Sequence, residues 1–276
     1  MNQLAVSSIA WTNQEEKDVA KVFRKLSVKN VELAPTKLWG DPTKATDSEI
    51  ADVLDFWESN GQDVVAFQSM LFGRENLKIF EDELTRQETA NFLKDFIRLA
   101  GKMGVKVLVF GSPKNRQRGK VAYDQAFDIA KDFFGDLGDV ARENNTCFCI
   151  EPNPIDYACD FVTNAQQGIE LVKAVNNEGF GLHLDIAGMT LAGDDIAESI
   201  KNAAPVLRHF HASSPQLGQV EAAGGIDHET AAVALADINY KGFVSIEMRP
   251  AEAGQNVERV EKAVMYIREV YEKHLS

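Results

Sequence analysis

Four potential metal ligands stand at the ends of four short apolar stretches in the second half of the chain. They are Glu151, Asp185, His211 and Glu247, which close Cys-Ile-Glu, Gly-Leu-His-Leu-Asp, Leu-Arg-His-Phe-His and Phe-Val-Ser-Ile-Glu. Three carboxylates and one imidazole offer oxygen and nitrogen donors without sulfur, a set that suits a hard or borderline divalent cation. The sequence therefore predicts one divalent metal ion, with Mn²⁺, Mg²⁺ and Co²⁺ as candidates and Zn²⁺ as an alternative.

The spacing of these ligands predicts that they meet in space. Successive ligands are separated by intervals close to the roughly 30 residues of a strand-plus-helix unit. If the four stretches are parallel strands joined by helices, their carboxyl ends share one rim. Pro152 and Pro154 cannot extend a strand hydrogen-bond ladder, so they end the first of these strands at Glu151 and hold its carboxylate at that rim.

The rest of the chain shows the same alternation of strand and helix patterns. Earlier strands are expected at 4–11, 30–33, 64–67 and 105–110, and later helices at 164–175, 194–203, 228–237 and 257–274. Thr-x-x-Glu capping boxes at Thr12, Thr46 and Thr85 mark three helix starts. Eight strand–helix units predict an α/β protein with a closed (β/α)₈ TIM barrel, in a single domain over residues 1–276.

Composition excludes several kinds of partner. A net charge of −13 disfavours nucleic acid, because Lys and Arg supply most of the affinity for a phosphate backbone. The chain does not start with a basic segment and an apolar core, and it contains no apolar run near 18 residues. We therefore expect a cytoplasmic protein without a membrane partner. The 3 cysteines form no C-x-x-C pair, which argues against a disulfide framework or a cysteine zinc site.

The motifs at the four strand ends resemble the xylose-isomerase-like superfamily of sugar isomerases and epimerases. The matching segments are Ile-Glu-Pro-Asn-Pro, His-Leu-Asp-Ile-Ala-Gly-Met, His-Phe-His-Ala-Ser-Ser and Gly-Phe-Val-Ser-Ile-Glu, and the resemblance covers essentially the whole chain. In the ketose 3-epimerase branch the four matching positions hold the ion, and the two glutamates exchange substrate protons. The resemblance thus implies catalytic roles for Glu151 and Glu247 and a small sugar or sugar phosphate as substrate. It leaves homo-oligomer formation open.

The resemblance also implies a mechanism. A divalent ion that chelates a carbonyl and a neighbouring hydroxyl acidifies the carbon-bound proton and stabilises an enediolate. Return of the proton on the opposite face gives epimerisation, whereas return to the neighbouring carbon gives aldose–ketose isomerisation. The sequence does not separate these outcomes.

Two departures argue against a simple tagatose or psicose 3-epimerase. The position three residues after the strand-six aspartate is a substrate-binding histidine in those enzymes, and here it is Gly188. The arginine expected soon after the strand-seven histidine is absent from residues 212–218.

Four further residues are candidates for substrate binding. His183 and His209 each precede a proposed ligand by two residues, so strand periodicity turns them inward. There each binds a sugar hydroxyl, supports the metal ligands or is a core histidine. Asn153 follows Glu151 in the first motif. Arg116 lies in a loop with four basic residues, 111–120, where it either captures an anionic group or belongs to a solvated loop.

Rival functions share parts of this pattern. An abasic-site endonuclease relative needs additional histidines for a multi-zinc cluster, and this chain has only 5. A hydroxypyruvate isomerase or an inosose dehydratase-like enzyme would use the same four ligands, and both alternatives stay open. A non-catalytic sugar-binding barrel is disfavoured by the intact set of ligands.

Overall fold

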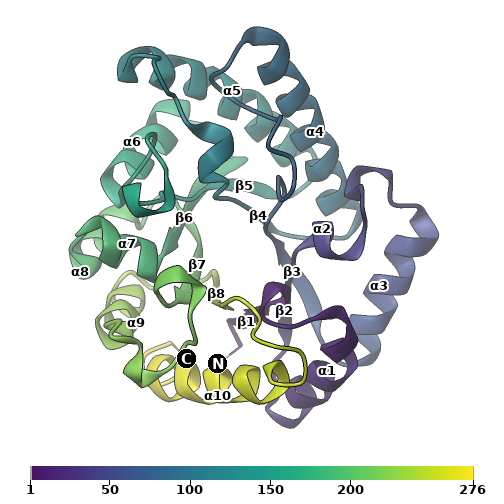
Figure 1. Ribbon diagram of the computed structural model, residues 1–276. Coiled ribbons are helices and arrows are strands. Elements are labelled where there is room, and N and C mark those ends of the chain that lie inside the picture. The colour runs from purple at the N-terminus through teal and green to yellow at the C-terminus, as the bar shows by residue number, and fades with distance from the viewer. Residues whose placement is uncertain (1, 276) are drawn as a thin grey trace.

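Short buried strands form the centre of the fold. In the computed structural model, which describes residues 2–275, the strands pair in parallel and in chain order, and β8 returns to β1 to close a barrel (Figure 1). The strands are β1 (Leu4–Ser7), β2 (Asn30–Leu33), β3 (Asp63–Phe67), β4 (Val107–Phe110), β5 (Cys147–Ile150), β6 (Phe180–Asp185), β7 (Leu207–Ser213) and β8 (Phe243–Glu247). The predicted TIM barrel is confirmed.

Helices follow the strands and surround the barrel (Figure 1). They are α1 (Glu16–Lys25), α2 (Pro35–Leu38), α3 (Asp47–Ser59), α4 (Glu83–Lys102), α5 (Tyr123–Glu143), α6 (Ala165–Val175), α7 (Ile186–Ala192), α8 (Ile196–Ala203), α9 (His228–Asp237) and α10 (Asn256–Tyr271). The single domain over 1–276 stays a prediction, and Met1 and Ser276 lie outside the described residues.

The core has two parts because the strands are covered on both faces. Side chains on the outer face of the barrel join those of the helices in one large apolar cluster. A second, small cluster contains Ala5, Val65, Ala66, Val107, Val109 and Cys149. Strand alternation places Val109 and Cys149 on the inner face, in phase with Glu151. Small and branched side chains thus fill part of the barrel interior.

The predicted helix starts are confirmed at two places and wrong at a third. Thr12 with Glu15 and Thr46 with Glu49 form capping boxes. Thr85 does not begin α4, because Asp82 precedes it and accepts the Thr85 amide hydrogen at 2.8 Å. The aspartate carboxylate offers a cap one turn earlier, so the helix begins there.

Other features also differ from the prediction. The first strand ends at Ser7, where the hydroxyl caps a 3₁₀ turn over Ser8–Ala10, instead of continuing to residue 11. Helix α7, directly after β6, was not expected.

Among residues 2–275, no helix combines the length and the apolar character needed to cross a membrane.

Helix α5 lies in close contact with the start of β6, and this contact predicts how a substitution there changes the stability of the fold. A Cβ added at Gly179 would collide with the carbonyl oxygen of Gly138 and lie 2.7 Å from the amide nitrogen of Arg142, both in the backbone of α5. Gly179→Ala should therefore lower the free energy of unfolding by about 1–3 kcal/mol in urea denaturation, because backbone cannot rotate away.

Gly135→Ala on the same helix is the matched control. Nothing lies within 4 Å of a Cβ there, so alanine should raise stability by about 0.5–1 kcal/mol. Equal stability of the two variants would show that α5 does not pack against β6 in this way.

Candidate functional site

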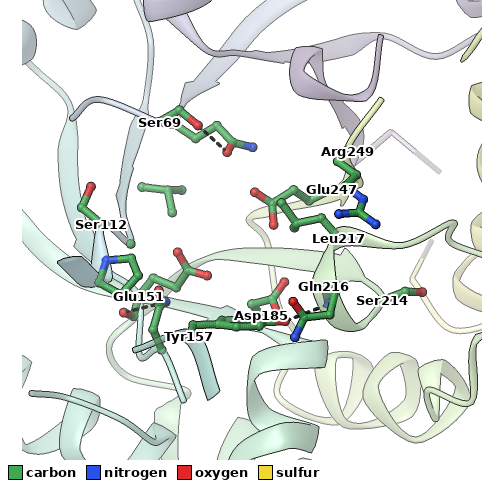
Figure 2. Close-up of a pocket in the computed structure, with 15 residues that line it drawn as sticks. Ser69, Ser112, Glu151, Tyr157, Asp185, Ser214, Gln216, Leu217, Glu247 and Arg249 are labelled. Carbon is green, nitrogen blue, oxygen red and sulfur yellow. Dashed lines mark hydrogen bonds between the residues drawn. The ribbon is translucent and has the colours of Figure 1, made fainter. Parts of the chain in front are cut away.

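The four predicted ligands converge at the carboxyl ends of the strands. Asp185 and Glu247 end β6 and β8, His211 lies in β7, and Glu151 directly follows β5. Glu151, Asp185 and Glu247 line a cavity of about 350 Å³, and Figure 2 shows their carboxylates turned toward a common space. His211 is fully buried beneath them.

The donor atoms of this group lie close together. One atom each from Glu151, Asp185 and His211 lies within 4.8 Å of the others. The Nδ1 atom of His211 lies 3.3 Å from a carboxylate oxygen of Glu247. Oxygen and nitrogen donors at such separations are consistent with a divalent metal site.

Local structure fixes the orientation of Asp185. One of its carboxylate oxygens accepts the amide hydrogen of Gly188 at 2.6 Å, as the N-cap of α7. The other accepts a hydrogen bond from the Ser213 hydroxyl on the neighbouring strand β7. Because both oxygens are held, the Asp185 carboxylate remains turned toward the cavity, with lone pairs left for another contact.

The Glu151 carboxylate occupies space left by a glycine. A Cβ at Gly111, in the loop after β4, would collide with a carboxylate oxygen of Glu151. Asn153 lines the same cavity, and its side-chain amide donates to the carbonyl oxygen of Glu151 at 3.4 Å. The loops after β4 and β5 thus hold the carboxylate between them.

The carboxylates repel one another. Burial and the charges of Glu247 and Asp185 raise the pKa of Glu151 to about 8. Burial and Glu247 raise the pKa of Asp185 to about 6. Because a cation between them would remove the repulsion, the electrostatics of the site favour a bound positive ion.

Beneath the carboxylates lies a buried layer of three histidines and Glu32. The Glu32 carboxylate, on β2, lies 3.2 Å from Nε2 of His209 and 3.1 Å from Nε2 of His211. Burial raises the pKa of Glu32, but the charges of His211 and His209 outweigh it and hold the pKa well below the usual value. Burial lowers the pKa of His211, but Glu32 and Glu247 hold it well above the usual value.

Glu32 was not among the residues predicted for the site. A glutamate within the apolar strand Asn30–Leu33 was the available signal, since a charged group inside a covered strand needs a buried partner.

His183 and His209 are not where contact with a sugar would require them. Neither lines the cavity, and both are fully buried. Among the described residues, neither ring nitrogen of His183 has a hydrogen-bond partner, whereas His209 contacts Glu32. The position of both rings beneath the cavity floor therefore favours the alternative of core histidines over contact with a sugar hydroxyl.

Arg116 also requires a correction. Its side chain is fully buried, and its guanidinium donates to the carbonyl oxygens of Phe161 at 3.1 Å and Glu151 at 2.5 Å. Because the guanidinium donates its hydrogens to these carbonyl oxygens, Arg116 fixes the loops around Glu151 and does not face an anionic substrate. The sequence showed the charge of the loop but not that this one side chain folds inward.

Other residues of the cavity wall were not predicted. Arg249 is exposed and lies beside Glu247 at the cavity (Figure 2). It follows Glu247 by two residues, and extension of the strand alternation by one step would have found it. The Tyr157 hydroxyl accepts the amide hydrogen of Gln216 at 3.1 Å and links the loops after β5 and β7.

A family model and curated relatives match the chain. The model for the xylose isomerase-like TIM barrel family matches residues 21–270. A D-psicose 3-epimerase of Agrobacterium fabrum is 29% identical over 134 residues, which cover 46% of this chain and 45% of that enzyme. The chain therefore matches less than half the length of this curated relative.

Solved structures match over almost the whole length. D-psicose 3-epimerase with D-tagatose from Clostridium cellulolyticum H10 has a TM-score of 0.80 and 17% identity, with coverage of 98% of this chain and 99% of that chain. The IOLI protein with a bound zinc atom has a TM-score of 0.79 and 19% identity, with 99% of each chain covered. At these identities the likeness shows the fold.

The raised carboxyl pKa values predict how stability depends on pH. Between pH 4.5 and about 8, folded Glu151 holds a proton that the unfolded chain has lost, so the free energy of unfolding should fall as pH rises. We expect this fall in urea titrations of the protein kept in chelator. Glu151→Gln should flatten the curve above about pH 6, because the amide has no proton to lose. Parallel curves for the two proteins would contradict the assignment.

Proposed function

The chain belongs to the xylose isomerase-like TIM barrel family, and we propose that it is a divalent-metal-dependent isomerase or epimerase of a sugar or sugar phosphate. The observation that carries the proposal is the set of three carboxylates and one imidazole at the carboxyl ends of β5 to β8. Glu151, Asp185, His211 and Glu247 would hold one ion, with Mn²⁺, Mg²⁺ and Co²⁺ as the candidates and Zn²⁺ as an alternative. When bound, such an ion polarises a substrate carbonyl and acidifies the neighbouring carbon-bound proton.

Glu151 and Glu247 would carry the proton transfer. They project into the cavity from different strand ends, and Figure 2 shows space between their carboxylates. A substrate carbon held in that space would have a carboxylate on each side. One carboxylate takes the proton as the enediolate forms, and the other returns a proton to the opposite face, which gives epimerisation. Return to the neighbouring carbon gives isomerisation.

The same residues fit a hydroxypyruvate isomerase or an inosose dehydratase-like enzyme. Both reactions begin with removal of a proton from a carbon beside a carbonyl, so the two glutamates would have the same first role. The cavity volume of about 350 Å³ accommodates a small polar substrate. The relatives are sugar epimerases, which favours a sugar.

Solvent exchange tests the proton transfer. In D₂O with Mn²⁺, the protein should exchange a carbon-bound proton of D-psicose, D-tagatose or D-fructose, as followed by NMR. Glu151→Gln and Glu247→Gln should each slow this exchange about 10²–10⁴-fold, because an amide cannot act as a base. Glu143→Gln, at the exposed end of α5, is the control and should exchange at the wild-type rate. Exchange at the wild-type rate in both site variants would reject the mechanism.

Arg249 supports an anionic substrate. It is the arginine that lines the cavity, and among the described residues its guanidinium has no carboxylate partner. Two cations of the loop 111–120 are engaged elsewhere: Arg118 donates to the Asp160 carbonyl oxygen at 3.0 Å, and Lys114 lies 3.8 Å from Glu75. A guanidinium held at the cavity without a partner can bind a phosphate or a carboxylate.

Arg249→Gln should therefore weaken binding of a charged sugar selectively. Loss of a charge-assisted hydrogen bond of about 1.5–3 kcal/mol should make the KM of the variant for D-fructose 6-phosphate roughly 10- to 150-fold higher than that of the wild type. The KM for D-fructose should change little. Lys114→Gln removes the same charge from the loop after β4 and should change neither value. Equal effects of Arg249→Gln on the two sugars would show that the substrate is neutral.

A further inference from the structure

We propose that Glu32 is a positioning residue for the metal site: it holds the proton of His211 on Nε2 and so presents Nδ1 of that ring to the carboxylate cluster. The inference rests on the proposed function, because it concerns the ion that Glu151, Asp185, His211 and Glu247 would share. Glu32 itself lies too deep to touch a substrate, since it is fully buried and does not line the cavity.

The first observation is the environment of the Glu32 carboxylate. It extends from β2 across the barrel interior to β7, and both of its oxygens lie 3.1 Å from Nε2 of His211. One oxygen also lies 3.2 Å from Nε2 of His209. An ionised carboxylate only accepts hydrogen bonds, so each facing Nε2 must carry the hydrogen. A buried carboxylate without such donors would cost several kcal/mol, which makes this arrangement of protons the stable one.

The second observation is the opposite edge of the His211 ring. Nδ1 lies 3.3 Å from Glu247, on the side of the ring that faces the cavity carboxylates, and it has no well-aligned hydrogen bond. A metal ion at the cluster would displace the second ring proton, which leaves the remaining hydrogen on Nε2 and a lone pair on Nδ1 directed at that cluster. A carboxylate behind a histidine fixes ring orientation and increases the basicity of the opposite nitrogen.

The third observation is the packing that keeps the ring in place. His183 lies edge-on to His211 with ring centroids 4.1 Å apart, and His209 flanks both rings with centroids 5.3 Å from each. In the register of the barrel, His183 pairs with His209 and Asp185 with His211. The histidine layer therefore leaves His211 little freedom to turn its Nε2 away from Glu32.

Mn²⁺ binding, measured by titration calorimetry, tests the inference. Glu32→Gln should weaken Mn²⁺ binding about 10- to 100-fold, because the amide can donate to Nε2 and shift the ring proton to Nδ1. Glu15→Gln is the matched control: Glu15 is also a buried glutamate, but it contacts Asn256 and Thr12 and does not line the cavity. It should lower stability and leave Mn²⁺ affinity at the wild-type value.

A spectroscopic measurement separates positioning from general damage to the fold. In the protein loaded with Zn²⁺ and labelled with ¹⁵N-histidine, wild-type His211 should show a protonated Nε2 and a metal-shifted Nδ1. Glu32→Gln should lose the slowly exchanging Nε2 proton. Glu32→Asp, which keeps the charge, should retain more of the affinity than Glu32→Gln.

The outcomes distinguish the two proposals. If Asp185→Ala binds Mn²⁺ as the wild type does, the metal site itself is wrong and this inference fails with it. If Asp185→Ala loses the ion while Glu32→Gln keeps wild-type affinity, only the role of Glu32 is overturned. Two ions per wild-type chain, with one lost in Glu32→Gln, would also overturn it, because the Nε2 atoms would then be metal ligands instead of N–H donors.

Discussion

Mutual repulsion among carboxylates in a barrel mouth is the constraint on which the site depends. Glu151, Asp185 and Glu247 lie together where burial already disfavours their charges, and the pKa values of Glu151 and Asp185 rise accordingly. Folding tolerates this because local structure accommodates Asp185 and Glu151. Asp185 is fixed by Gly188 and Ser213, and Glu151 has the room left by Gly111. The stability that the apolar layers supply thus maintains a repulsive arrangement of carboxylates, and a bound cation would relieve that repulsion.

The barrel interior is graded from polar to apolar along its axis. The carboxylates lie at the rim, the three histidines and Glu32 lie beneath them, and Ala5 lies further down, one inward position below Ser7, which pairs with Glu32. His211 connects the upper two layers, since one ring nitrogen faces Glu32 and the other faces Glu247. The buried polar layer costs stability in itself, which explains why its members pair with one another across the barrel.

The periodicity of the sequence was sufficient to predict the barrel and the residues at its rim. Strand ends follow from local signals, such as Pro152 after Glu151, and parallel strands bring those ends together. Contacts between distant segments were not predictable in the same way. Arg116 turns inward because carbonyls 35 to 46 residues later accept its hydrogens. Glu32 finds its histidines 177 and 179 residues away. No pattern within a single strand or loop contains that information.

The division between strands and loops also explains why the sequence predicts a class of chemistry better than a substrate. The proposed ligands lie at strand ends, whose positions the hydrogen-bond ladder and the register of β6, β7 and β8 determine. The walls of the cavity come from loops, including Ser69, Ser112 and Gln216. Gly188 adds no side chain to the cavity and leaves its amide for Asp185. We therefore expect the substrate to be recognised by loop residues such as Arg249, whose positions depend on tertiary contacts. A barrel can change those residues without disturbing the ligand set, because the loops do not carry the strand pairing that holds it.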